Sequence, residues 1–165
     1  MLEIRTKLST NQNDAAFDDS VSLSFDLRQK SRLRVTLASG QEAAIYMNRG
    51  EIMRGGDILQ ADNGALIQVQ AADQAVMKVT AKSTHDLMRA AYHLGNRHVP
   101  LQIGDGCLQL ESDYVLKDML LGLGVEVTEV EAAFEPESGA YGGGHHHHND
   151  DDHAHSHSHE HSHKH

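Results

Sequence analysis

The sequence predicts an α+β protein with a small all-β domain, a ferredoxin-like domain of element order βαββαβ, and a histidine-rich C-terminal tail. Residues 1–73 alternate apolar and polar positions as strands do. Residues 74–141 contain two segments of helical spacing between strand-like runs. Residues 142–165 hold almost nothing that builds a core, so we expect a disordered, histidine-rich tail there.

Period-2 alternation marks the strands expected in the N-terminal domain. Its apolar positions are Val21, Leu23 and Phe25, then Leu33, Val35 and Leu37, then Ile45 and Met47, then Ile67 and Val69. Turn residues separate these runs at Ser39-Gly40, Gly55-Gly56-Asp57 and Asp62-Asn63-Gly64. The Asn-Gly pair lies between two apolar runs and predicts a β-hairpin. Because no helical period of useful length is present, we expect this domain to be all-β.

Two helices are expected in the second domain. The first follows Ser83-Thr84, which suit the N-cap position, and Gly95 is expected to end it. Its apolar stripe is Leu87, Ala90, Ala91 and Leu94. The second begins at Ser112 or Asp113 and ends at Gly124. Its stripe is Leu116, Met119, Leu120 and Leu123. Strand-like runs complete the order at residues 76–79, 101–103, 107–111 and 125–130.

Composition excludes several classes of function. The 165 residues carry a formal net charge of -10, which repels phosphates and disfavours nucleic-acid binding. No apolar run approaches the roughly 18 residues of a membrane span, and the opening MLEIRTKL has no apolar signal-peptide core. Cys107 is the only cysteine, so no intramolecular disulfide forms. Phosphate-loop and common hydrolase motifs are missing. We expect a cytoplasmic protein that is not an enzyme.

Histidine is concentrated at the C-terminus. Eleven of the fourteen histidines lie in the last 21 residues: His145, His146, His147, His148, His153, His155, His157, His159, His161, His163 and His165. Imidazole nitrogens suit Ni(II), Cu(II) and Zn(II), and a flexible chain wraps such ions in exchangeable sites. A purification tag would be a plain run of histidines, whereas Asp, Ala, Ser, Glu and Lys interrupt this one. A purely solubilising tail would be better served by Asp or Glu at neutral pH. The tail therefore indicates metal transport or storage.

Three histidines lie outside the tail. His85 is expected to face water, and His93 is expected to border the core as a structural residue. His98 precedes Val99-Pro100 in a loop, where its side chain is free to point outward. One histidine makes a weak site, but a two-fold dimer with this loop at its axis doubles the ligands. Tail histidines would then fill the remaining positions.

Four basic residues, Arg28, Lys30, Arg32 and Arg34, share one parity in an otherwise acidic chain. As strand residues they would project from one face. This face is either simply solvated or a docking patch for an acidic partner.

Two sequence blocks resemble the UreE family of urease accessory proteins. They are residues 92–102 (YHLGNRHVPLQ) and 134–141 (FEPESGAY), and Arg49-Gly50 and Arg54-Gly55-Gly56-Asp57 add to the resemblance. It implies a β-rich domain likened to a heat-shock peptide-binding domain, followed by a ferredoxin-like metal-binding domain. It also implies a homodimer in which His98 of each subunit binds Ni(II), assisted by tail histidines. The family delivers nickel to urease apoprotein together with the urease accessory GTPase and the other accessory proteins.

The resemblance has one departure, and one rival function stays open. Some family members carry further histidines where this chain has Glu111, Ser112, Asp113 and Tyr114. An accessory site there would rest on Glu111 or Asp113, whose oxygens suit Ni(II) less well than imidazole. The rival is a storage or buffering protein that holds transition metals, including Zn(II) or Cu(II), in its tail. The residues predict a borderline transition metal, whereas nickel follows from the resemblance.

Overall fold

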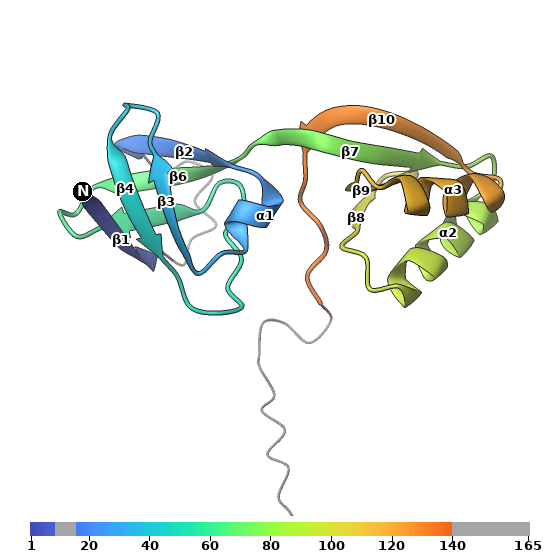
Figure 1. The fold of residues 1–165 in the computed structure, drawn as a ribbon, viewed down its shortest axis with the longest axis horizontal. Helices are drawn as coiled ribbons and strands as arrows, with labels where there is room; N and C mark the ends of the chain where they lie inside the picture. Colours follow the sequence, from blue (N-terminus) through green and yellow to red (C-terminus); the bar gives the residue numbers. More distant parts are fainter. Residues whose placement is uncertain (9–15, 140–165) are drawn as a thin grey trace, which may run out of the picture.

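Each half of the chain is built on its own β-sheet in the computed structural model, which describes residues 1–8 and 16–139 (Figure 1). The first sheet has six strands in the order β2-β6-β5-β1-β4-β3. Their bounds are Leu2–Lys7 for β1, Asp19–Leu23 for β2, Arg32–Thr36 for β3, Glu42–Tyr46 for β4, Ile58–Ala61 for β5 and Leu66–Ala71 for β6. The second sheet begins directly afterwards, so the chain has two domains of mixed α+β content.

Alternating apolar side chains form the core of the first domain. Ile4, Ile45, Leu59 and Val69 are fully buried, as a period-2 pattern requires of one sheet face. The hairpin expected at the Asn-Gly pair is confirmed, because β5 and β6 are antiparallel neighbours. Gly64 closes its turn at φ 85°, a conformation that favours glycine.

The first domain also contains a helical turn that the alternation did not predict. α1 spans Phe25–Arg28, so the expectation of a strand at Phe25 is wrong. The side chain still points inward: the Phe25 ring packs edge-on against Phe134, with centroids 5.3 Å apart. Alternation of apolar residues indicates which side chains are buried. It does not distinguish a strand from a single helical turn that begins at a buried residue.

The second domain has the element order strand, helix, strand, strand, helix, strand, as the spacing predicted. The bounds are Asp73–Thr80 for β7, Thr84–Asn96 for α2, Gln102–Gly104 for β8, Cys107–Glu111 for β9, Tyr114–Gly122 for α3 and Glu126–Ala133 for β10. The sheet order is β10-β7-β9-β8, and both helices cover one face of it (Figure 1). Met77, Leu94, Leu110 and Leu120 form the core between sheet and helices.

Side-chain caps define where the two helices begin. The Ser83 hydroxyl accepts a hydrogen bond from the Asp86 amide at 3.1 Å. One Asp113 oxygen accepts from the amides of Val115 and Leu116 at 2.9 and 3.0 Å. Of the two N-caps considered for the second helix, the structure uses Asp113.

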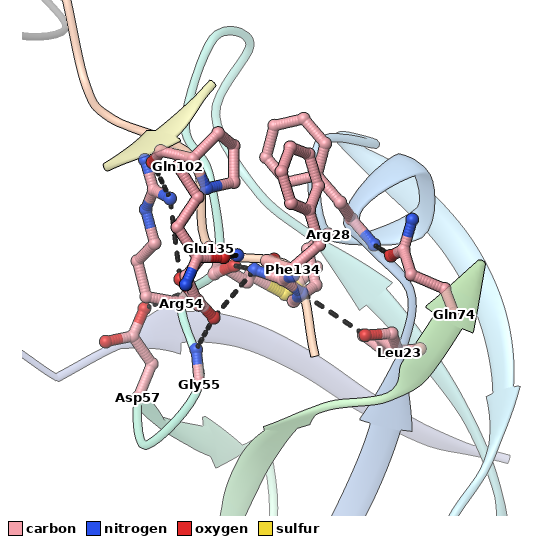
Figure 2. Close-up of polar contacts among 12 residues, drawn as sticks. Leu23, Arg28, Arg54, Gly55, Asp57, Gln74, Gln102, Phe134 and Glu135 are labelled. Atoms are coloured by element: carbon pink, nitrogen blue, oxygen red, sulfur yellow. Dashed lines mark hydrogen bonds and ion pairs between the residues drawn. The ribbon is translucent and has the colours of Figure 1, made fainter. Parts of the chain in front are cut away.

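A buried arginine joins the two domains. After β10 the chain turns back between the domains (Figure 1), and Glu135 there meets Arg28 of α1 at 3.0 Å (Figure 2). Arg28 is 0% exposed and also donates to the carbonyl oxygens of Leu23, Met53 and Phe134. Arg28 therefore does not share an exposed face with Lys30, Arg32 and Arg34, because the turn of α1 breaks the strand parity before β3 begins.

Among the described residues, no helix is long and apolar enough to cross a membrane.

Candidate metal-binding site at His98

His98 lies in the turn that ends α2. The helix runs through Gly95 to Asn96, so the expected end at Gly95 is wrong. The His98 amide donates to the Gly95 carbonyl at 3.0 Å, and the Val99 amide donates to the Leu94 carbonyl at 3.2 Å. This pair of bonds is a Schellman motif, and Val99 packs with buried Leu94 in the domain core. That packing and Pro100, rather than a glycine, set the helix end.

His98 occupies the position of this motif that glycine usually fills. Its φ is 56°, and it is the one non-glycine residue with positive φ in the described part of the chain. A left-handed conformation costs a residue with a Cβ about 1 kcal/mol, although histidine tolerates it better than most. α3 ends with the ordinary solution, Gly124 at φ 82°. The α2 turn therefore holds an exposed imidazole where a glycine would be more stable.

A depression of about 450 Å³ surrounds the turn. Its lining residues are Arg97, His98, Val99, Pro100, Glu111, Ser112, Asp113 and Leu116. The fold thus brings His98 to the segment where an accessory site was considered. Both carboxylates there are engaged: Asp113 caps α3, and Glu111 accepts from the Gln74 side-chain amide at 3.3 Å. Within residues 1–8 and 16–139, no three His, Cys, Asp or Glu side chains form a metal-binding group.

The other predicted histidines fall into two groups. His85 is exposed and His93 half-buried beside the Tyr92 ring, as the helix spacing predicted, and neither lines the depression. The eleven tail histidines predicted as ligands, at positions 145–165, lie outside the described residues.

The segment that leads to the tail is held close to the His98 loop. The Glu137 amide donates to the Leu101 carbonyl at 2.8 Å, and the Glu135 amide donates to the Gln102 side chain at 2.9 Å (Figure 2). Leu101 is three residues after His98 in the chain. The root of the tail therefore lies beside the strand that follows the candidate ligand.

Glu135 is a structural residue that the sequence did not reveal. Its carboxylate receives Arg28 at 3.0 Å, Arg54 at 3.4 Å and the Gly55 amide at 2.9 Å (Figure 2). A Cβ at Gly55 would lie 3.1 Å from the same carboxylate, so glycine permits this approach. Burial lowers the pKa of Arg28, and the nearby Glu135 carboxylate acts in the opposite direction. The sequence offered one sign of this contact: Arg54-Gly55 and Glu135-Pro136 both belong to the segments that resemble the family. The resemblance gave neither segment a role.

Comparison with known proteins accounts for both blocks. Residues 2–72 match the N-terminal domain model of the UreE urease accessory protein, and residues 74–165 match its C-terminal domain model. The urease accessory protein UreE of Ralstonia nicotianae (strain ATCC BAA-1114 / GMI1000) is 59% identical over 123 residues, or 74% of this chain and 58% of the relative. That of Cupriavidus necator (strain ATCC 17699 / DSM 428 / KCTC 22496 / NCIMB 10442 / H16 / Stanier 337) is 57% identical over 123 residues, or 74% of this chain and 64% of the relative. Each alignment covers less than two thirds of the relative's own length. The chain belongs to the UreE family of urease accessory proteins.

Proposed function

We propose that this protein is a binding protein that captures Ni(II) and delivers it for assembly of the urease active site. The observation that carries the proposal is the exposed His98 imidazole, held in a left-handed turn where glycine would be more stable. Family membership supports a role in urease maturation. Imidazole supports a borderline transition metal, and nickel follows from the metal that urease assembly needs.

A homodimer would supply the second ligand. Exposed large apolar side chains concentrate on the second domain, which carries six of the eight among the described residues. Tyr92 on α2 is 68% exposed, and Tyr114, next to the Asp113 that lines the His98 depression, is 81% exposed. Apolar surface of this kind favours association. A two-fold axis near these residues would place two His98 side chains on one ion.

Tail histidines would complete and reload the site. Glu137 is bonded to Leu101, and His145 follows it by eight residues, which span at most about 28 Å when extended. Tail imidazoles are thus within reach of His98 of the same or the partner subunit. Sites made in this way exchange readily, because each capture also orders the chain.

Three further assignments belong to this proposal. We assign the second domain to the ferredoxin-like class, supported by its element and strand order. We place the domain boundaries at 1–73, 74–141 and 142–165. We also place the protein in the cytoplasm, with the urease accessory GTPase, the other accessory proteins and urease apoprotein as partners.

An accessory oxygen site at Asp113 is not part of this proposal. A metal ion bound there would compete with the backbone amides of α3 that the Asp113 carboxylate caps.

Delivery is tested by activation of urease. Nickel-loaded protein and an equal concentration of free Ni(II) are each mixed with urease apoprotein and its accessory proteins, and urease activity is followed. The loaded protein is expected to activate urease faster. His98→Ala should remove this advantage, and His85→Ala, at an exposed histidine on the preceding helix α2, is its matched control. Equal activation by free ion would overturn delivery and favour storage in the tail.

A further inference from the structure

A second depression, of about 590 Å³, lies where the chain leaves the second domain for its C-terminal tail. Its lining comes mainly from residues 48–52 of the first domain and from residues 137–139 at the end of the described chain. These two segments include the Arg49-Gly50 pair and part of the 134–141 block. Neither segment has a part in the proposed metal site, so the depression calls for an occupant of its own.

The chain is held in place at the rim of this depression. Arg54 of the first domain, which also lines it, donates to the Ser138 hydroxyl at 3.1 Å. The preceding amide, that of Glu137, donates to the Leu101 carbonyl of the second domain at 2.8 Å. Consecutive residues are thus bonded to both domains. Because Gly139 itself lines the depression, the chain enters the tail at this rim.

The lining offers an apolar wall and an available cation. Ile52 is half-buried and packs on the core cluster that contains Phe134. Lys7 is neutralised by Glu51 at 3.2 Å, whereas Arg49 is exposed and has no ion pair within residues 1–8 and 16–139. A guanidinium beside an apolar wall is a favourable surrounding for an aromatic ring with a polar tip.

We propose that Tyr141 of the same chain fills this depression, with its ring between Ile52 and the Arg49 guanidinium. Tyr141 follows Gly139 by two residues, so its Cα lies within about 7 Å of the rim. It is the last aromatic residue of the chain, and Ala154 is the one apolar residue after it. No other side chain of the tail therefore suits the apolar wall.

Docking of Tyr141 would separate the tail from the contacts between the domains. The tail would then start at Gly142, the first of three glycines. A metal ion captured beyond Gly142 would pull on the docked ring and not on the Glu135 contacts. This consequence rests on the proposed metal capture, whereas the docking itself needs no metal.

A tryptophan probe tests the docking. The chain contains no tryptophan, so light that only tryptophan absorbs excites position 141 alone in the variant Tyr141→Trp. The control is Ala154→Trp, whose probe lies thirteen residues further along the tail. In the full chain without metal, we expect acrylamide to quench the probe at 141 at least about threefold less than the probe at 154. Equal quenching of the two probes would overturn the proposal.

Removal of the cation tests the location. In the Tyr141→Trp chain, Arg49→Ser should lower the ratio of docked to free probe about two- to fivefold, because the ring loses its cation. Arg32→Ser removes another exposed arginine of the first domain and should leave the quenching unchanged. Equal effects of the two substitutions would overturn the assignment to this depression. Quenching that changes on dilution would indicate the ring of a second copy and would contradict docking within one chain.

Methyl NMR of the metal-free full chain tests the natural side chain, because tryptophan is larger than tyrosine. A nearby aromatic ring shifts the resonance of a methyl group, so Tyr141→Ser should move the methyl signals of Ile52. The signals of Ile4 and Ile45, in the core of the first domain, should stay unchanged. An Ile52 signal that does not move would overturn the proposal. None of these readouts involves nickel, so their outcomes are independent of the proposed delivery function.

Discussion

The two blocks that carry the family resemblance have opposite physical surroundings. His98, in the first block, is exposed in a left-handed turn. Glu135, in the second, binds Arg28, Arg54 and the Gly55 amide between the domains. The first block keeps the His98 imidazole exposed, at a cost in backbone conformational energy. The second block provides a carboxylate partner for the buried charge of Arg28. One block therefore exposes the imidazole that we propose as a ligand, and the other holds the two domains together.

The Arg28→Met variant tests the architectural block and should have the largest effect. Methionine leaves Glu135 without its buried partner and four hydrogen bonds unmade, so the free energy of unfolding should fall by about 3–5 kcal/mol. Chemical denaturation measures this, and nickel affinity below the transition should be unchanged. Arg32→Met, at an exposed arginine, should change stability by less than about 0.5 kcal/mol. Equal effects of the two substitutions would show that the contact of Arg28 with Glu135 in the second block does not stabilise the fold.

Lowering the pH should affect the metal block and spare the architectural one. Protons compete with Ni(II) for the imidazole lone pair, whose ordinary pKa is near 6.5. Between about pH 7.5 and 5.5 each histidine ligand should weaken binding about tenfold, so two ligands give about a hundredfold loss. Arg28 keeps its charge throughout this window, so its ion pair should persist. Calorimetry on the full chain checks this, and an unchanged nickel affinity at both pH values would contradict histidine ligation.

Replacing His98 with glycine should separate stability from binding. Glycine relieves the left-handed conformation, so the free energy of unfolding should rise by about 0.5–1 kcal/mol. Removal of the imidazole should lower nickel affinity at least about tenfold in a chain ending at Tyr141, which retains every described residue. Calorimetry and chemical denaturation measure the two quantities, and His85→Ala is the control. Retention of one tight ion per dimer would exclude His98 as the ligand.

The Gly124→Ala variant makes the reverse substitution at the end of α3, because it adds a Cβ to a residue in the left-handed conformation. No atom would lie within 4 Å of the added Cβ, so any loss comes from the backbone conformation at φ 82°. We expect about 1 kcal/mol lower stability and unchanged nickel affinity. An alanine variant as stable as the parent would show that the left-handed turn carries no such cost, and the argument from His98 would lose its energetic basis.

The pattern of residues predicted most of the fold because burial follows local period. Alternation located β2, β3, β4 and β6, and the Asn-Gly pair predicted the hairpin of β5 and β6, whereas β1 was not singled out. The helical stripes of the second domain gave its element order. The same reasoning identified His98 as an exposed loop histidine, since Val99-Pro100 follows it. It failed at Gly95, where the helix continues, because packing of Val99 on Leu94 outweighs the weak helix preference of one glycine.

The sequence by itself determined the two-domain order, the strand and helix faces, and the supply of imidazole ligands, since each depends on nearby residues. Only the tertiary structure decided that Arg28 is buried, that Glu135 joins the domains, and that His98 occupies a glycine position. Arg28 and Glu135 are 107 residues apart, and local periodicity carries no information about a contact at that separation. The backbone angle of His98 is likewise set by the core packing of its neighbour.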